Sequence, residues 1–365
     1  MRIMVGIGHP KQVHFWTNII NNLTNNGHEI KIVAWDKDKT IELLNAYGFK
    51  YEIIGKNYIG LIKKAYGMFA SELKLLKIAN KFKPDLLVAG APYLAHVSRL
   101  IGKPHISFTD TEHASLANCL SFPFSNVIFT PSCYREKIDP KKHVKFEGYM
   151  ELAYLHPNYF KPDQSVLKDM SLDKEDKFII VRLVSWDASH DRQSKGFTID
   201  FIEKSIKSLE KYGRVYITSE KKLNSTLNKY KIPFPPEKLH SALYYASLYF
   251  GEGGATATEA ALLGTPSVHF EAFLTKSGEV TDVIQGQHIG VRDELVNKYG
   301  IAYTFGNQDQ ALIKAEEILQ EENIKEQMKE KLKQLLNDKV DVTDLISNFI
   351  ENYPESFLKY KSTEY

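Results

Sequence analysis

Short apolar runs alternate with longer amphipathic stretches along the first third of the chain. The apolar runs predict strands at 3–7, 29–34, 51–54, 84–90, 104–108 and 126–130. The amphipathic stretches carry apolar residues at helical spacing and predict helices at 13–25, 40–47 and 61–81. Strands separated by helices of this length are typical of a parallel, doubly wound sheet, so we predict an α/β fold here.

A second series of the same kind follows a segment without clear period at 148–157. Its apolar runs predict strands at 178–184, 214–218, 248–250 and 267–270. Its amphipathic stretches predict helices at 197–212, 223–230, 241–246, 310–337 and 340–353. We interpret the segment without period as an interdomain linker, which gives a first domain at 1–150 and a second at 151–339.

Composition supports this organisation and narrows the function. A chain of 365 residues suits two domains. Its 47 Lys and Arg against 45 Asp and Glu leave a net charge of +2, which argues against bulk binding of nucleic acid. The two cysteines do not make a disulfide scaffold, and no apolar run approaches the roughly 18 residues of a membrane span. No leader precedes the first predicted strand. We therefore expect a cytoplasmic protein.

The most informative segment is the glycine-rich turn that follows the predicted strand at 248–250. Gly251, Gly253 and Gly254 lead into a short alanine-rich helix, whose first backbone N–H groups have no partner within the helix. Such a helix start is a ready site for a phosphate group, and glycine lets the ligand approach the backbone. Thr256 and Glu259 lie three residues apart and share one face of this helix. The alternative is a tight turn without a ligand.

Other polar candidates follow predicted strands, at the sheet edge where α/β proteins bind ligands. His9 lies in the first turn and is either a general base or a simple turn residue. Asp110 and Glu112 lie on one side of an extended segment, unless Asp110 caps a helix. The loop at 185–196 is dense in polar residues and is otherwise a solvated loop. These residues have no tight metal-ligand spacing, so we predict no metal.

The glycine-rich unit resembles the donor-site motif of the two-domain glycosyltransferase fold called GT-B. It is most similar to the version in the non-hydrolysing UDP-N-acetylglucosamine 2-epimerases, which share that fold. The residues that carry the likeness are Glu252-Gly253-Gly254, Glu259-Ala260 and Gly264-Thr265-Pro266, with looser matches at Thr111-Glu112-His113-Ala114 and Lys195-Gly196-Phe197. The whole chain also resembles a family of archaeal and bacterial proteins catalogued as a domain of unknown function.

The resemblance implies two Rossmann-like domains in GT-B arrangement, with the helix at 340–365 packing back on the first domain. Nucleotide-sugar donor binding would fall to the second domain and acceptor binding to the first. Contacts to the donor would come from Gly253, Gly254, Thr256 and Glu259, of which the glutamate binds the ribose. The loop after the first strand of the second domain would add Ser185, His190 and Arg192. Acid–base candidates are His9, Asp110, Glu112 and His190.

These features predict a glycosyltransferase that moves a sugar from a nucleotide donor, with UDP expected, to a glycan or lipid-linked acceptor. The donor is a substrate, so no cofactor is expected, and a peripheral membrane contact stays open. One alternative is a nucleotide-sugar 2-epimerase, although the epimerases carry a carboxylate where this chain reads Gly90-Ala91-Pro92. A further alternative is a binding protein without catalysis.

Overall fold

The computed structural model divides the chain into two compact units. It describes residues 1–56, 61–112, 114–184, 194–220, 222–274, 280–281 and 289–363, with the side chains of 61–66, 194–195, 273–274 and 280–281 left aside. The first unit comprises Met1–Tyr159 and Lys339–Tyr365, and the second comprises Phe160–Asp338.

The first unit is built on a seven-stranded parallel sheet in the order β3-β2-β1-β4-β5-β6-β7. Its strands are β1 (Arg2–Ile7), β2 (Glu29–Asp36), β3 (Tyr51–Lys56), β4 (Leu86–Ala89), β5 (His105–Phe108), β6 (Val127–Pro131) and β7 (His143–Phe146). The central strands are buried on both faces, as β4 and β5 show along their whole length. This is why they appear in the sequence as continuous apolar runs rather than alternating ones.

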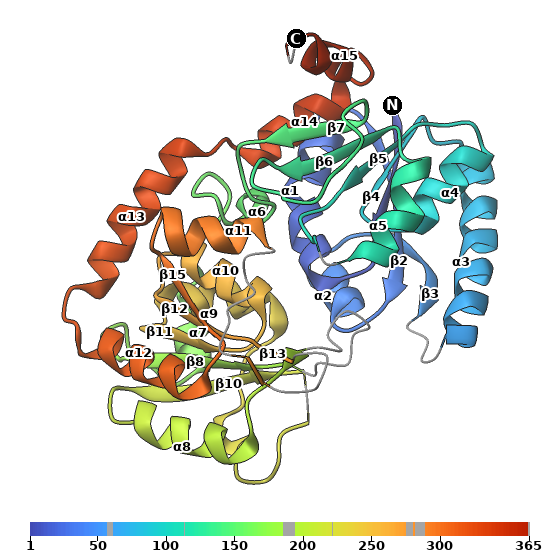
Figure 1. Cartoon of the computed structure of the whole chain (residues 1–365). Coiled ribbons are helices and arrows are strands. Elements are labelled where there is room, and N and C mark those ends of the chain that lie inside the picture. The colour runs from blue at the N-terminus through green and yellow to red at the C-terminus, as the bar shows by residue number, and fades with distance from the viewer. Residues whose placement is uncertain are drawn as a thin grey trace. The chain divides into compact units, whose positions relative to one another are not determined.

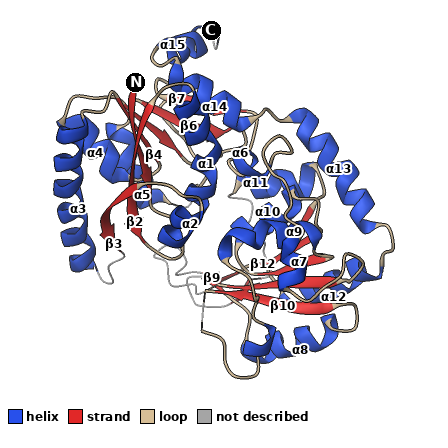
Figure 2. Cartoon of the chain, turned by 180° about the vertical axis from the view of Figure 1, so that it is seen from behind, coloured by secondary structure: helices blue, strands red, loops and turns tan. Residues whose placement is uncertain are grey.

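Helices cover both faces of this sheet (Figures 1 and 2). One group packs together from α1 (Pro10–Asn25), α2 (Thr40–Ala46), α6 (Leu152–Leu155) and α14 (Val342–Glu351). The other contains α3 (Leu61–Phe82), α4 (Pro92–Leu100) and α5 (Ser115–Ser121), followed by the 3₁₀ turn η1 (Phe122–Phe124). The last helix is α15 (Glu355–Thr363). The return of α14 to the first unit rests on buried contacts, such as the hydrogen bond of 2.6 Å from the Thr343 hydroxyl to the Ala153 carbonyl.

The second unit is built on a five-stranded parallel sheet in the order β10-β8-β11-β12-β15. Its strands are β8 (Phe178–Leu183), β10 (Arg214–Ser219), β11 (Leu248–Gly251), β12 (Ser267–Phe270) and β15 (Ala302–Phe305). A small antiparallel sheet joins β9 (Ser194–Lys195), β13 (Ala272–Leu274) and β14 (Val280–Thr281).

The helices of the second unit lie on both sides of its parallel sheet (Figure 2). Those described are α7 (Ser165–Asp169), α8 (Ile199–Leu209), α9 (Leu239–Tyr245), α10 (Gly254–Leu262), α11 (Gly290–Asp293), α12 (Gln308–Gln320) and α13 (Ile324–Asp338). Shorter turns are the 3₁₀ segments η2 (Asn228–Tyr230) and η3 (Pro236–Lys238) and the π-helical segment η5 (Glu294–Lys298). Two parallel α/β units are therefore present, as the sequence predicts.

Several local predictions need correction. The helix expected at 223–230 is reduced to the single turn η2, and the helix expected at 310–337 is two helices, because α12 ends at Gln320 and α13 starts at Ile324. The segment at 148–157 is not an exposed linker. Its residues from Tyr149 to Leu155 are buried, and α6 packs on α1, so the first unit runs to Tyr159 rather than ending at residue 150.

Candidate functional site

The glycine-rich turn lies at the point where the strand order of the second sheet reverses. From β8 the chain moves outward to β10 on one side, then crosses to β11 on the other side. In open α/β sheets, the crevice at the carboxyl ends of two such strands is the usual ligand site. The carboxyl end of β11 leads directly into Glu252, Gly253 and α10. The sequence-predicted donor site is therefore at the switch point of its sheet.

The backbone of this turn requires glycine at two positions. Gly253 is the N-cap of α10 with φ of 84°, in the left-handed region that side chains disfavour. A Cβ on Gly251 would overlap the carbonyl oxygen of Arg182 on the neighbouring strand. Gly253 and Gly254 are half-buried and Ala255 is exposed, so the start of α10 is partly accessible to solvent. Because the N-cap residue is a glycine, it has no side chain that could accept hydrogen bonds from the first amides of α10.

Glu252 holds the turn in place rather than facing a ligand. Its carboxylate is buried and accepts hydrogen bonds from the backbone N–H of Val184, at 2.7 Å, and of Phe197. These two amides flank the segment at 185–196. The Tyr249 hydroxyl donates in turn to the Glu252 carbonyl. A buried carboxylate satisfied by backbone donors is a structural brace.

Arg182 brings a cation to this turn from the last part of β8. Its guanidinium donates to the Thr218 hydroxyl at 2.8 Å and pairs with Glu220 at 2.5 Å. Its Nε lies 3.8 Å from the position of a Cβ on Gly253, and this buried donor has no hydrogen-bond partner among the described residues.

Arg292 of α11 brings a second cation. A Cβ built on Gly254 would overlap its Nη2, so the guanidinium lies against the first residue of α10. The Arg292 side chain is 12% exposed and forms an ion pair with Glu271, which follows β12. A guanidinium beside a helix N-terminus places two positive features together, because the helix start carries about half a positive charge. Glu271 supplies part of the compensating negative charge.

His269 of β12 is a third unusual group in the second unit. Both of its ring nitrogens are buried without a hydrogen-bond partner among the described residues. Burial and the nearby Arg292 guanidinium hold its pKa well below the ordinary value, so the ring is neutral. A buried polar group without a partner has a free-energy cost, which a ligand or water can offset.

Of the other residues predicted to contact the donor, two lie in the described part of the chain and three lie outside it. Thr256 is buried in the first turn of α10. Glu259 is buried in its second turn, and its Oε1 lies 3.2 Å from the Nε2 of His240 on α9. Ser185, His190 and Arg192 lie outside the described residues, so their contribution stays a prediction.

In the first unit, His9 performs a structural task. The strand order reverses between β1 and β4, and Gly8 and His9 follow β1 at that point. His9 is exposed and is the N-cap of α1, where its Nδ1 accepts a hydrogen bond of 3.2 Å from the backbone N–H of Lys11. The neutral imidazole has one acceptor nitrogen, and this cap uses it.

The strongest ionic feature of the first unit is a lysine between two carboxylates. Lys11 Nζ lies 2.5 Å from Asp110 Oδ2 and 2.7 Å from Glu151 Oε1. Side-chain exposure is 22% for Lys11, 12% for Asp110 and 3% for Glu151, so solvent screens these pairs weakly. Lys11 belongs to the first turn of α1, which contains no acidic residue of its own. The two carboxylates therefore also complement the positive end of this helix.

These three groups shift one another's pKa. Burial alone would lower the pKa of Lys11, but the two carboxylates more than offset this and raise it. Burial tends to raise the pKa of Asp110, and the Lys11 charge with its hydrogen bond brings it below the ordinary value. For Glu151, burial prevails over the Lys11 charge, so its pKa is raised. Glu151 Oε2 has no hydrogen-bond partner among the described residues.

Glu112 lies near this cluster but inside the protein. The Glu112 side chain is buried. The burial of Tyr134 and the charge of Glu112 together raise the pKa of the Tyr134 hydroxyl. Asn118 donates to the Tyr134 hydroxyl and to the Thr111 carbonyl, both at 3.3 Å. This network fixes the loop that carries Asp110.

Sequence reasoning missed four of these charged residues. Arg182 is a charge inside the apolar run of β8, and that anomaly could have marked it. Lys11 lies two residues after His9, which the sequence marks as a candidate. Glu151 lies in the segment that we interpreted as a linker, so its burial was not expected. No sequence motif marks Arg292, because only the tertiary fold brings it to α10.

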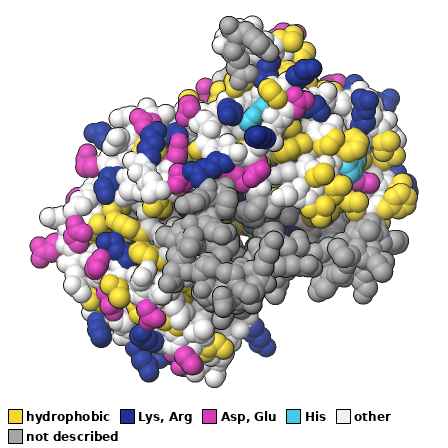
Figure 3. All heavy atoms as spheres, viewed as in Figure 1, with side chains coloured by type: hydrophobic (Ala, Val, Ile, Leu, Met, Phe, Trp, Pro, Cys, Tyr) yellow, Lys and Arg dark blue, Asp and Glu magenta, His cyan; other side chains and the backbone are white. Residues whose placement is uncertain are grey.

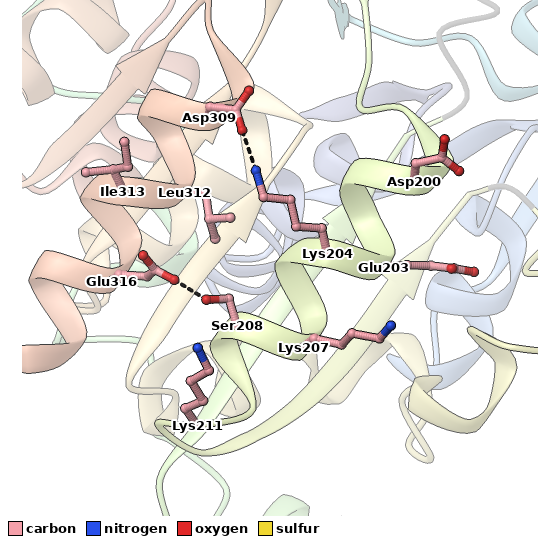
Figure 4. A pocket seen from close by; sticks show the side chains of 10 residues that line it. All are labelled: Asp200, Glu203, Lys204, Lys207, Ser208, Lys211, Asp309, Leu312, Ile313 and Glu316. Carbon is pink, nitrogen blue, oxygen red and sulfur yellow. Dashed lines mark hydrogen bonds and ion pairs between the residues drawn. The ribbon is translucent and has the colours of Figure 1, made fainter.

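The surface has a polar groove in the second unit and an apolar area in the first. A groove of about 620 Å³ lies between α8 and α12 (Figure 4). Lys204 pairs with Asp309 at 2.7 Å and Ser208 donates to Glu316, and the lining carries both lysines and carboxylates, so the groove has no strong excess of either charge. Figure 3 shows apolar side chains gathered over α3, α4 and α5. The exposed apolar residues of this surface are Phe69, Leu73, Leu100, Leu116 and Phe124.

The described part of the chain contains neither a metal-binding group nor a spanning helix. No three His, Cys, Asp or Glu side chains among the described residues converge as metal ligands would. Nor does any helix within that part combine the length and apolar character needed to cross a bilayer.

Comparison with known proteins gives a family and a fold. A family model described as "Protein of unknown function (DUF354)" matches residues 1–284. An uncharacterized protein of Methanocaldococcus jannaschii is 24% identical over 276 residues, covering 73% of this chain and 80% of that protein. UDP-GlcNAc 2-epimerase from Neisseria meningitidis bound to UDP-GlcNAc has a TM-score of 0.60 at 14% identity, over 98% of this chain and 100% of that chain. The glycosyltransferase SsfS6 of Streptomyces sp. SF2575 has a TM-score of 0.57 at 15% identity, over 96% and 100%.

At these identities the solved structures establish the fold alone. The two parallel α/β units match those of UDP-GlcNAc 2-epimerases and GT-B glycosyltransferases, which confirms the predicted fold class. The predicted likeness to an archaeal and bacterial family is confirmed as well.

Proposed function

The chain belongs to the DUF354 family, and from the charges at the start of α10 we propose that it is a glycosyltransferase with a nucleotide-sugar donor. The donor is expected to be a UDP-sugar, whose diphosphate binds at the N-terminus of α10 in the second unit. The acceptor, a glycan or lipid-linked hydroxyl, is expected to bind the first unit.

One observation carries this proposal: the Arg292 guanidinium lies against Gly254 at the first turn of α10. The partial positive charge of the helix start and the guanidinium repel each other unless an anion lies between or beside them. Glu271 neutralises the guanidinium, but it leaves the partial positive charge of the helix start, whose first amides have no acceptor within the helix. A diphosphate supplies two adjacent negative charges and several acceptor oxygens, which suits this arrangement.

The other donor contacts follow from the same geometry. Gly253 and Gly254 would donate their backbone N–H groups to phosphate oxygens, with Thr256 in the same turn. Arg182 would add charge from the neighbouring strand. Glu259, one turn further along α10, would hold the ribose hydroxyls. Low-identity solved structures of this fold include a protein bound to UDP-GlcNAc and a glycosyltransferase, which supports a nucleotide-sugar enzyme.

A nucleotide-sugar epimerase is the second candidate, and the cluster of Lys11, Asp110 and Glu151 favours it over a binding protein without catalysis. Epimerisation needs several positioned acid–base groups, and this cluster adds two that the sequence did not suggest. Incubation with UDP-GlcNAc alone separates the candidates. An epimerase converts the sugar without an acceptor, whereas a transferase leaves the sugar configuration unchanged in a proton NMR spectrum.

Calorimetric titration with UDP tests the proposal. Arg292→Ala should weaken UDP binding by about tenfold or more, since it removes charge-assisted hydrogen bonds. Glu271→Gln should strengthen binding, because it releases the guanidinium from its ion pair. Arg214→Ala, at an exposed arginine of the same unit, is the matched control and should leave the affinity unchanged. Absence of UDP binding, or equal affinity in all four proteins, would contradict the proposal.

A further inference from the structure

Asp110 of the first unit combines a charge held by a buried lysine cluster with partial access to solvent. Asp110 is 12% exposed, and Lys11 holds its Oδ2 at 2.5 Å. The Thr111 hydroxyl donates to Oδ1 at 3.1 Å, so both oxygens are oriented. Glu151, on the far side of the same lysine, is 3% exposed and closed to solvent.

The two other acid–base candidates of this unit are less suited to receive a proton. The Nδ1 of His9 accepts the N-cap hydrogen bond of α1, so taking a proton there would break the cap. Glu112 is buried, and a substrate would have to displace the loop to reach it. A general base must lie within hydrogen-bond reach of the proton that it takes. Asp110 is partly exposed, so a hydroxyl can reach it without breaking the cap or displacing the loop.

We propose that Asp110 is the general base for an acceptor hydroxyl, and that Lys11 and Glu151 are positioning residues that orient it and set its proton affinity. This inference rests on the proposed glycosyltransferase function. Asp110 takes the hydroxyl proton while the acceptor oxygen forms a bond to the anomeric carbon. The bond from that carbon to the diphosphate oxygen breaks, and its electron pair leaves with the nucleoside diphosphate.

The charges of the cluster also select the chemical class of acceptor. With both carboxylates ionised, Lys11, Asp110 and Glu151 sum to one negative charge. A carboxylate or phosphate acceptor would be repelled there and would need no base, whereas a neutral hydroxyl needs the base and is not repelled. The expected acceptor group is therefore a sugar or alcohol hydroxyl.

Glu151 gives the cluster a pH dependence of its own. The groups that act on these carboxylates are Lys11 of α1, Thr111 and each other, and Asp110 also interacts electrostatically with Tyr134, which Glu112 and Glu136 influence as well. Because the pKa of Glu151 is raised, its carboxyl keeps a proton into a higher pH range than an ordinary glutamate. When it ionises, it competes for the Lys11 charge and strengthens Asp110 as a base.

The test uses the full chain, UDP-GlcNAc as donor and methanol as a small hydroxyl acceptor, with UDP release as the readout. Asp110→Asn should slow UDP release by about 100-fold or more. Glu151→Gln should remove the higher-pH inflection from the rate profile, which a merely structural role would leave in place. Both variants should bind UDP as the wild type does. Glu136→Gln, at an exposed carboxylate of the same unit, should change neither readout.

The outcomes separate this inference from the proposed function. Failure of the wild type to bind UDP defeats the proposed function, and the base assignment falls with it. Normal UDP binding with Asp110→Asn within about threefold of the wild-type rate, or with no UDP release by the wild type, overturns the base assignment. If Asp110→Asn does not fold, Thr111→Val replaces it and should shift the acid limb of the profile to higher pH, because it removes a hydrogen bond to the Asp110 carboxylate.

A titration without ligand provides the independent arm. In ¹³C NMR spectra of labelled carboxyl groups, Asp110 should titrate below and Glu151 above their ordinary values, with Glu151→Gln for assignment. Titration of both groups near ordinary values would overturn the inference even if UDP binds.

Discussion

Replacement of Lys11 by Met should destabilise the first unit more than any ordinary lysine substitution. The side chain is similar in length, so packing changes little, but Asp110 and Glu151 lose their shared cation. Both carboxylates are largely buried, at 12% and 3% side-chain exposure. Removal of one partner from a buried ion pair costs about 3–5 kcal/mol, because it leaves an uncompensated charge. Lys11 itself is 22% exposed, which places the expected loss at the low end, about 3 kcal/mol.

The loss should grow with pH. The depressed pKa of folded Asp110 gives the wild type stability that is present above the ordinary carboxyl pKa and lost as pH falls through the folded value. Without Lys11 this contribution disappears. Glu151 also loses the charge that opposes its upward shift, so its ionisation at higher pH becomes more costly. The difference between the two proteins should therefore be largest near neutral pH and should shrink below about pH 4.

Urea unfolding followed by tryptophan fluorescence measures this difference. Trp16 and Trp35 are buried in the first unit, and a Trp186→Phe background removes the third tryptophan. Lys39→Met is the matched control. Its pair with Glu42 is as short, at 2.5 Å, but 61% and 46% exposed, so it should lose under about 1 kcal/mol. Equal losses for the two lysine variants, or a Lys11→Met loss that does not depend on pH, would refute the reasoning.

Three other substitutions have expected outcomes. Gly251→Ala should lose about 1–3 kcal/mol more stability in urea unfolding than Gly102→Ala, because both glycines have a positive φ but only the Cβ at residue 251 would overlap a backbone carbonyl, that of Arg182. His9→Ala should lose about 1 kcal/mol with the N-cap of α1 and leave UDP affinity unchanged in calorimetry. Glu259→Gln should weaken UDP binding by about tenfold and leave inorganic diphosphate binding unchanged; an equal effect on both ligands would contradict a ribose contact.

The fold could be predicted from the sequence because its central strands are buried on both faces. The expected strand at 3–7 is β1 (Arg2–Ile7), and the expected strand at 178–184 is β8 (Phe178–Leu183). Such continuous apolar runs are hard to mistake when helices separate them. Edge strands gave weaker signals. β7 and β15 were not predicted, and β15 alternates between buried and half-buried positions.

The candidate site could be predicted only where it is local in sequence. The turn from Gly251 to Gly254 can be recognised in the sequence, because several glycines between a strand and a helix are typical of a phosphate-binding turn. Arg292 and Glu151 could not be found in this way. The first reaches α10 through the packing of α11, and the second reaches Lys11 through the packing of α6 on α1. Contacts between charged residues on different helices and strands can be identified only from the tertiary structure.

The most direct test of a diphosphate site at α10 is to observe its backbone amides while UDP is added. In ¹H–¹⁵N spectra of the labelled full chain, the largest shifts should fall on the N–H groups of Gly253, Gly254 and Ala255, and Arg292→Ala should require more UDP to produce them. Shifts that leave these amides unmoved while other residues respond, or a spectrum indifferent to UDP, would contradict the account.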